Sequence, residues 1–233
     1  MEALSRQSTV LEAVYAALRD SICEGRLTPG ERLTQDDIAD QLGVSRQPVG
    51  QALILLKSQG FVSETGRRGL VVASLRIETV RDIYELRGAL DGLAASLAAQ
   101  RAGPELLARG TKILDEGREL VERGDVAGLL KADMAFHDFL YEASKNPLIE
   151  PALTAHWHQL RRVMTGVIEQ DSYRAQLWDE HAAILDAIAA GDEDRAGRLA
   201  RCHVAAACAA LCAKLETAQD NERPVAIAGT TGR

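Results

Sequence analysis

The pattern of hydrophobic and polar positions changes character near residue 77. Before that point, short stretches with helical spacing are separated by turn signals and end in two short apolar runs of strand type. After it, apolar residues recur every three or four positions as far as about residue 218. The pattern predicts a mainly α-helical protein with two domains, residues 1–76 and residues 77–218. Residues 219–233 do not continue it and are expected to form a disordered tail.

The first domain is punctuated by residues that start and stop helices. A helix is expected over about residues 10–24, and Pro29-Gly30 marks a turn after it. Thr34 is a suitable N-cap for a short second helix. Gly43 supplies a tight turn, and Ser45 is a natural N-cap for a third helix. This succession predicts a helix-turn-helix.

The third helix has one apolar face and is followed by a strand pair. Its apolar positions recur at i, i+3, i+4 and i+7, and they are Val49, Ala52, Leu53 and Leu56. Residues 61–62 and 70–72 are strand candidates on either side of a short polar segment. The first domain is therefore predicted to be a winged helix-turn-helix with a small β-hairpin wing.

The polar face of the third helix carries side chains that can read DNA. Arg46, Gln47 and Gln51 project outward when the apolar positions are buried. Arg can bind guanine and Gln can bind adenine through paired hydrogen bonds, each pair contributing roughly 1–3 kcal/mol of discrimination. The helix N-terminus offers N–H groups to phosphate, and basic residues at the wing tip can grip the backbone or minor groove. The expected DNA contacts are Ser45, Arg46, Gln47, Gln51, Arg67 and Arg68.

A simpler interpretation of the first domain is a helical hairpin with a solvated basic surface. The turn, cap, periodicity and wing all agree with the DNA-reading interpretation, which we therefore favour. The distribution of charge along the chain is consistent with the DNA-reading interpretation. Residues 1–77 are formally neutral, so the remainder carries the whole net charge of −7. That distribution argues against a non-specific DNA coat protein and suits contact with DNA through one small face.

Targeting and cysteine chemistry add little. The first residues lack the apolar core of a signal peptide, and the longest apolar run, residues 204–213, is too short to span a bilayer. We expect a cytoplasmic protein with no membrane partner. Cys208 and Cys212 share a helix face and are expected to be buried small residues, with a thiol sensor or a metal site as the alternatives.

The second domain is predicted to be an antiparallel bundle of about six helices. Gly, Pro, Asn and Asp residues separate the helical stretches. The expected helices span about residues 78–101, 104–123, 126–144, 148–170, 173–190 and 193–218.

Four ionisable residues lie on the inward faces of three of these helices. Asp133 and His137 are one turn apart on the stripe of the third bundle helix, and His181 and His203 lie on the stripes of the fifth and last. A divalent cation would satisfy three imidazoles and one carboxylate at once. The alternative is that each histidine is a core residue bonded to a carbonyl, with Asp133 and His137 as a simple helix pair. His156, beside the inner stripe of its helix, is a candidate to line a cavity.

The first domain resembles a known family. Residues 29–33 (Pro-Gly-Glu-Arg-Leu) and 42–49 (Leu-Gly-Val-Ser-Arg-Gln-Pro-Val) are similar to the amino-terminal domain of GntR-family transcriptional regulators, and the similarity covers nearly all of residues 8–74. The resemblance implies a homodimer, or a higher oligomer, that reads a palindromic operator. Gly50 stands where the family usually has a DNA-facing Arg. Either operator affinity is lower than usual, or Gln47 and Gln51 take over base reading.

Residues 78–216 resemble the ligand-sensing domain of the FadR-like branch, the FCD domain. The similarity rests on residues 133–137 (Asp-Met-Ala-Phe-His), 180–184 (Glu-His-Ala-Ala-Ile) and the stretch leading to His203. It implies a metal held by Asp133, His137, His181 and His203, with Zn²⁺ or Ni²⁺ favoured by the nitrogen-rich ligands and Mn²⁺ or Fe²⁺ as alternatives. Arg87 matches an arginine that meets an effector carboxylate. A surface ion pair with Glu85 or Asp91 is the competing interpretation.

The expected function is a metabolite-responsive DNA-binding transcriptional regulator that acts as a repressor. Its helical domain would bind a divalent metal and a small carboxylate effector, through Arg87 and His156, and the effector would alter operator binding. Two alternatives remain: a metal-dependent hydrolase-like enzyme, and a regulator that senses the metal itself. An enzyme is disfavoured because no general base occurs at the fixed spacing of an H-E-x-x-H motif.

Overall fold

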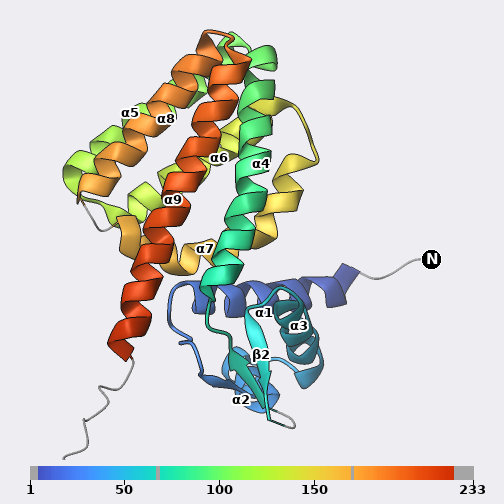
Figure 1. Ribbon diagram of the computed structural model, residues 1–233. Coiled ribbons are helices and arrows are strands. Elements are labelled where there is room, and N and C mark those ends of the chain that lie inside the picture. The colour runs from blue at the N-terminus through green and yellow to red at the C-terminus, as the bar shows by residue number, and fades with distance from the viewer. Residues whose placement is uncertain (1–4, 67–68, 169–170, 223–233) are drawn as a thin grey trace, which may run out of the picture. The chain divides into compact units, whose positions relative to one another are not determined.

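The computed structural model describes residues 5–66, 69–168 and 171–222 (Figure 1). These residues form two compact units. The first contains the residues up to 76 together with residues 151–162, and the second contains the remainder. Across the described residues, none of the helices combines the length and apolar character needed to cross a lipid bilayer.

The first unit is a winged helix-turn-helix, as the sequence predicts. Its helices are α1 (Ser5–Cys23), α2 (Gln35–Leu42) and α3 (Arg46–Ser58). Its strands are β1 (Arg32–Leu33), β2 (Val62–Thr65) and β3 (Gly69–Val72), which form an antiparallel sheet in the order β1-β3-β2. The hairpin formed by β2 and β3 is the expected wing. Strand β1, which pairs with Leu70 and Val71, was not expected because two residues are too few for a periodic signal.

The turn between α2 and α3 is set by its capping residues. Thr34 accepts a hydrogen bond from the backbone N–H of Asp37 at 3.2 Å, which caps α2 as expected. Gly43 takes the left-handed conformation, with φ of 63°, that ends α2 and that glycine adopts without strain. Ser45 occupies the N-cap position of α3, although its side chain makes no capping hydrogen bond.

The core of this unit is the predicted apolar face of α3. Val49, Ala52, Leu53 and Leu56 are buried and pack with Phe61 in one cluster. Because these inward positions are filled, the polar residues of α3 face solvent. Residues 151–162 belong to the same unit, and there the side-chain amide of Gln159 donates to the carbonyl of Gln59.

The second unit is the expected helical bundle. Its helices are α4 (Ile77–Arg101), α5 (Pro104–Arg123), α6 (Val126–Ser144), α8 (Asp171–Ala189) and α9 (Glu193–Glu222). Helix α7 (Ile149–Ile168) contributes its two ends to this unit, while its residues 151–162 belong to the first. Helix α9 extends past its expected end at residue 218, so residues 219–222 are helical. The rest of the expected disordered tail lies outside the described residues.

Small residues allow the bundle helices to approach closely. Helix α4 packs along α9 and against α6, and α5 packs against α6 and α8 (Figure 1).

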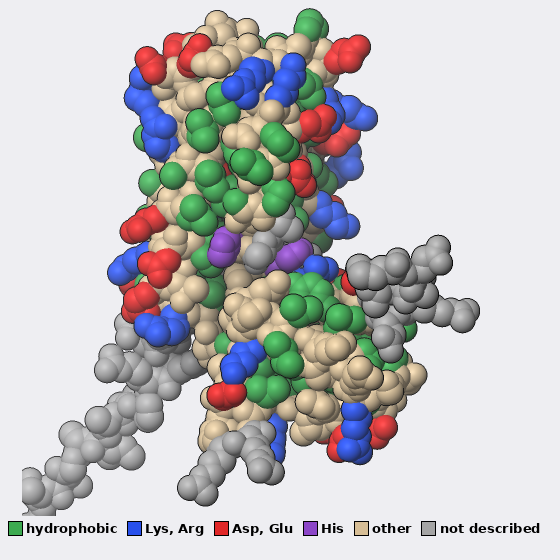
Figure 2. All heavy atoms as spheres, turned by 90° about the vertical axis from the view of Figure 1, so that its right-hand side faces the viewer, with side chains coloured by type: hydrophobic (Ala, Val, Ile, Leu, Met, Phe, Trp, Pro, Cys, Tyr) green, Lys and Arg blue, Asp and Glu red, His purple; other side chains and the backbone are tan. Residues whose placement is uncertain are grey.

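On the face shown in Figure 2, hydrophobic side chains gather among charged groups of both signs on the helical unit. The exposed apolar residues of α4 include Leu86 and Leu93, with 41% and 44% of their surface accessible.

Gly117 of α5 is a close-approach position. The Trp178 ring of α8 lies directly against it, so a Cβ built at residue 117 would be 1.7 Å from Trp178 Cζ2. The indole N–H donates to the carbonyl of Leu114 at 2.9 Å, which fixes the ring in this position. Neither the ring nor the helix backbone can move aside cheaply, because both are part of the packed core.

We expect Gly117→Ala to lower the free energy of unfolding by about 1–3 kcal/mol, because the added methyl group overpacks the Trp178 contact. Gly88→Ala in α4 is the matched control. There the new Cβ would lie 3.6 Å from Val204 Cγ1, an ordinary contact, so the variant should gain about 0.5–1 kcal/mol. Urea unfolding followed by circular dichroism measures both. Equal effects of the two substitutions would contradict the packing described.

Candidate metal centre and DNA-binding surface

Three helices bring the four candidate ligands together in the core of the bundle. Asp133 and His137 come from α6, His181 from α8 and His203 from α9. All four are buried, and one donor atom from each lies within 4.8 Å of the others. His181 Nε2 is 3.5 Å from Asp133 Oδ1 and 3.3 Å from His203 Nε2. The convergence expected from helical phase is therefore present.

These separations suit a metal ion. Metal–nitrogen bonds of 2.0–2.1 Å in a tetrahedral site place neighbouring donors about 3.4 Å apart. The two distances from His181 Nε2 are close to that value, and His137 Nε2 is 3.9 Å from Asp133 Oδ1. Within the described part of the chain, the buried atoms Asp133 Oδ2 and His181 Nδ1 have no hydrogen-bond partner. The cluster could hold a divalent cation, which would offset the unmet polarity of the carboxylate.

Carboxylates outside the cluster orient two of the imidazoles. Asp91 Oδ2 lies 3.2 Å from His137 Nδ1, and Glu180 Oε2 lies 2.8 Å from His203 Nδ1. A histidine that uses Nδ1 for such a partner presents the lone pair of Nε2 to a metal. The sequence pattern predicts neither of these carboxylate–histidine contacts. Glu180 directly precedes His181, but a contact to the histidine of another helix leaves no signature in spacing.

Arg87 is buried rather than on the surface. Only 2% of its side chain is exposed, and its Nε donates to Asp91 Oδ2 at 3.1 Å. The ion pair with Asp91, one of the two partners considered, is therefore present. The expectation that it lies on the surface is wrong, because the pair is buried. Tyr141 donates its hydroxyl to Asp91 Oδ1 at 2.8 Å, and Arg87 Nη2 lies 2.6 Å from His137 Nε2.

The charges of this network fix its protonation. Burial alone would raise the pKa of Asp91, but the adjacent Arg87 guanidinium and His137 hold that pKa at about 2. Burial would lower the pKa of Arg87, yet the charge of Asp91 and of nearby groups raises it above its ordinary value. Asp91 is therefore a carboxylate and Arg87 a guanidinium throughout the physiological range.

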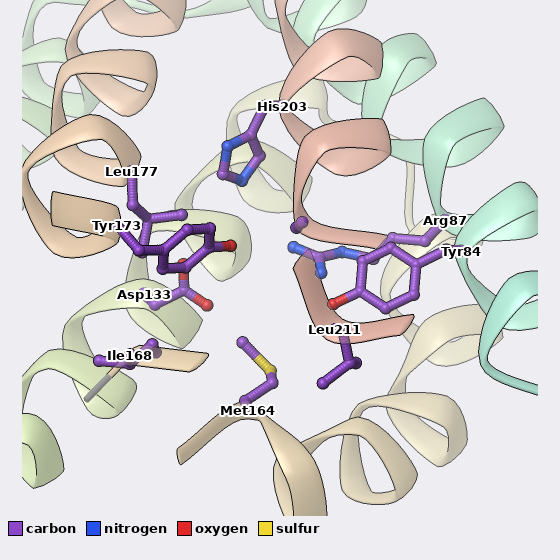
Figure 3. Close-up of a pocket in the computed structure, with 10 residues that line it drawn as sticks. Tyr84, Arg87, Asp133, Met164, Ile168, Tyr173, Leu177, His203 and Leu211 are labelled. Carbon is purple, nitrogen blue, oxygen red and sulfur yellow. The ribbon is translucent and has the colours of Figure 1, made fainter. Parts of the chain in front are cut away.

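A narrow cavity opens beside the cluster (Figure 3). Asp133, His203, Arg87, Tyr84 and Tyr173 direct polar groups toward it. Apolar side chains close the remaining sides, and they are Met164, Ile168, Leu177, Ala207 and Leu211. The space for the centre of a water-sized molecule is about 10 Å³, so the cavity holds roughly one water or ion. Burial raises the pKa of Tyr84 to about 12 and raises that of Tyr173, so both keep their hydroxyl hydrogens as donors.

His156 is not among the residues that line this cavity. It is half-buried on α7, and the cavity takes Met164 and Ile168 from that helix instead. Sequence periodicity did not single out the two tyrosines, because aromatic residues on a helical stripe are usual core residues. His156 therefore stays a prediction without support from the cavity.

The predicted base-reading residues lie on the outer face of α3. Ser45, Arg46, Gln47 and Gln51 are exposed. Arg46 Nε pairs with Asp36 Oδ1 of α2 at 2.5 Å, in an exposed ion pair that DNA phosphate could displace. A Cβ at Gly50 would lie 3.2 Å from the amide nitrogen of Gln35, so this exposed α2 side chain covers the position that Gly50 leaves bare. Arg67 and Arg68 lie outside the described residues.

Burial sets the protonation of the imidazoles. It lowers the pKa of His137, with the charge of Arg87 adding to the effect. It also holds the pKa of His181 well below its ordinary value, with His203 and His137 adding to the effect. Both side chains therefore favour the neutral form, which is the form that binds metals.

We expect the free energy of unfolding to fall as the pH drops below 6.5, the ordinary histidine value. In that range the unfolded chain takes up protons at His137 and His181 that the folded chain binds less readily, whereas above it the contribution is fully present. Urea unfolding in the presence of a chelator, at pH values on either side of 6.5, measures the slope. The double variant His137→Phe/His181→Phe should show a smaller slope. An unchanged slope would argue against this origin.

Comparison with known proteins gives the same division of the chain. The family described as "Bacterial regulatory proteins, gntR family" matches residues 11–72, and the FCD domain matches residues 82–206. The HTH-type transcriptional regulator YdhC of Bacillus subtilis is 27% identical over 209 residues, which are 89% of this chain and 93% of that protein. The Nta operon transcriptional regulator of Aminobacter aminovorans is 31% identical over 178 residues, covering 76% and 82% of the two chains.

The fold agrees with solved structures as well. E. coli McbR/YncC superposes with a TM-score of 0.70 at 23% identity, over 94% of this chain and 100% of that one, which supports the fold alone. A GntR regulator from Rhodococcus superposes equally well, with a TM-score of 0.70 at 26% identity over 88% and 98% of the chains. The named relatives are transcriptional regulators rather than enzymes. The chain belongs to the GntR family of HTH transcriptional regulators, in the FadR-like branch that carries an FCD domain.

Proposed function

We propose that this regulator is a metabolite-responsive repressor whose helical unit binds a divalent metal and a small carboxylate effector. The observation that carries the proposal is the buried cluster of Asp133, His137, His181 and His203 beside a cavity that also receives Arg87. A cation that takes a fifth or sixth ligand beyond the four of the cluster would offer that position to an anion, and it would polarise the anion's oxygen.

The metal we propose is Zn²⁺ or Ni²⁺, with Mn²⁺ or Fe²⁺ as less suited ions. Three imidazoles and one carboxylate form a nitrogen-rich set, which favours the first two. The residues that would hold the ion are those of the cluster, and Asp91 and Glu180 would keep two of the histidines oriented.

The effector we propose is a small carboxylate. The fixed positive charge of Arg87 and the hydroxyl donors of Tyr84 and Tyr173 face the cavity, which is a set of donors suited to an anion. Because the cavity has room for about one water, it would widen least for a compact molecule. We retain Arg87 as an effector residue, while His156 is a weaker candidate because it does not line the cavity.

On the DNA side, we propose that Ser45, Arg46, Gln47 and Gln51 contact a palindromic operator, together with the wing arginines at residues 67 and 68. The protein would act in the cytoplasm as a homodimer, each copy reading one half-site. Exposed apolar residues of α4 such as Leu86 and Leu93 support association of the helical units. Effector binding would favour a dimer arrangement with a different half-site spacing, and its differential affinity would drive the shift.

Arg46→Ala should weaken operator binding about 10-fold or more without lowering thermal stability, because it removes a base or phosphate contact from an exposed side chain. Fluorescence anisotropy with the native promoter fragment at physiological salt measures the affinity. Arg118→Ala, at an exposed position of α5, is the matched control and should bind as the parent does. Undiminished affinity of the Arg46 variant would refute its assigned role.

His181→Ala should reduce bound metal and lower the melting temperature of metal-loaded protein, because it removes a central member of the cluster. Elemental analysis of purified protein and a zinc titration measure the loss. Half-buried His156 provides the control, since His156→Ala should retain full metal content. Equal occupancy in parent and His181 variant would rule out the proposed centre. If chelation alone released operator DNA, the metal itself would be the signal.

A further inference from the structure

The two ring nitrogens of His137 have different roles: one accepts a hydrogen bond and the other carries the ring hydrogen. Arg87 Nη2 lies 2.6 Å from Nε2, and because a guanidinium only donates, Nε2 accepts through its lone pair. Nδ1 therefore carries the ring hydrogen and lies 3.2 Å from Asp91 Oδ2. The same Nε2 atom faces the metal cluster, 3.9 Å from Asp133 Oδ1. One nitrogen thus belongs both to the cluster and to the arginine contact.

An imidazole nitrogen has a single lone pair in the ring plane. It can accept a hydrogen bond or bind a cation, but not both at once. A divalent cation beside a guanidinium 2.6 Å from the shared atom would also experience direct charge repulsion in a buried site. The described contacts of His181 Nε2, with Asp133 and His203, involve no such cation. The conflict is therefore specific to His137.

We propose that Arg87 is an exchangeable partner of His137: its guanidinium leaves Nε2 when the histidine serves as a metal ligand, and its Nη groups then become the anion receptor of the cavity. This inference rests on the proposed metal centre and specifies how that centre is regulated. It predicts an order of binding, in which the cation comes first and the carboxylate second.

The contacts of Arg87 suit a pivot of its guanidinium about the hydrogen bond to Asp91. Its Nε is anchored to Asp91 Oδ2 at 3.1 Å, and Asp91 is held in turn by Tyr141. The guanidinium also lies 5.3 Å from the centre of the Tyr84 ring, and both residues line the cavity. A pivot of the whole planar guanidinium about its Nε–H···Asp91 hydrogen bond, through the side-chain torsions, would keep the Asp91 contact and turn the Nη donors toward Tyr84 and Tyr173. The buried ion pair would stay intact, so the exchange would not leave a charge unpaired.

Coupling between the two ligands follows from this exchange. While Arg87 Nη2 is held at His137, an anion in the cavity must bind through the remaining N–H groups of the guanidinium or displace that contact. Once that contact is broken, the anion finds a pre-formed partner. By thermodynamic reciprocity, the anion must then increase the affinity for the metal by the same factor.

The test separates the arginine contact from the metal. His137→Phe removes the acceptor of Arg87, and it should give the protein metal-independent binding of acetate. Acetate titration of the full chain in excess chelator, followed by thermal shift, should then give a saturable stabilisation that the parent lacks. His181→Phe is the matched control. It replaces another fully buried cluster histidine, also in contact with Phe136, but leaves the Arg87 contact in place, so it should gain no acetate response.

The double variant His137→Phe/Arg87→Met should lose the acetate response again, because the receptor itself is removed. No response in His137→Phe, or equal responses in the two single histidine variants, would overturn the exchange. If the phenylalanine variants fail to fold, Arg87→Met supplies an independent measurement. Its zinc affinity should rise roughly 10-fold or more, since a hydrogen bond from a charged donor no longer competes. Unchanged or weaker zinc binding would contradict the proposal.

Failure of the metal centre itself would give a different result. In that case parent protein would bind no zinc in a calorimetric titration. The acetate measurements in chelator would still report on the contact between Arg87 and His137.

Discussion

The helical unit is organised around four polar side chains in its core. Burial of apolar side chains there stabilises the fold, whereas burial of polar ones lowers the free energy of unfolding unless they are paired. Asp133 is 1% exposed and the three histidines of the cluster are 2% exposed or less. A buried charge without a partner destabilises a protein by several kcal/mol, so a core with this composition needs a compensating group. The donors come from α6, α8 and α9, so a shared ion would tie three helices together. Binding energy at such a point is also folding energy for the bundle.

A second polar network, centred on Asp91, contacts the candidate metal cluster and orients His137. Asp91 receives Arg87, His137 and Tyr141 at its two oxygens. The hydrogen bonds from Arg87 and Tyr141, together with the nearby imidazole of His137, stabilise this buried carboxylate without an ion. It also connects α4 to α6 through buried groups. Arg87, the proposed effector residue, and His137, a candidate metal ligand, thus share one carboxylate, so a change at either side chain would alter the position of the other.

The sequence predicted the fold and the ligand cluster because both are periodic. The apolar face of α3 and the stripes carrying Asp133, His137, His181 and His203 follow from 3.6-residue spacing together with the turn signals. Contacts between helices carry no such period, so the roles of Asp91 and Glu180 were missed. The surface ion pair considered for Arg87 was wrong for the same reason: composition near a residue does not reveal that a neighbouring helix covers it. Pairing of β1 depends on tertiary contact rather than on local preference.

The narrowness of the cavity bears on which molecules can act as signals. With room for about one water, the chamber must widen even for a compact anion, and a longer chain requires a larger rearrangement of the wall. Met164 forms part of that wall, and methionine has the most adaptable of the apolar side chains. Tyr84 and Tyr173 are stiffer and keep their hydrogens. Met164 would therefore select metabolites by size, and Tyr84 and Tyr173 would select them by hydrogen-bonding pattern. Relatives that differ at residue 164 would respond to acids of different length.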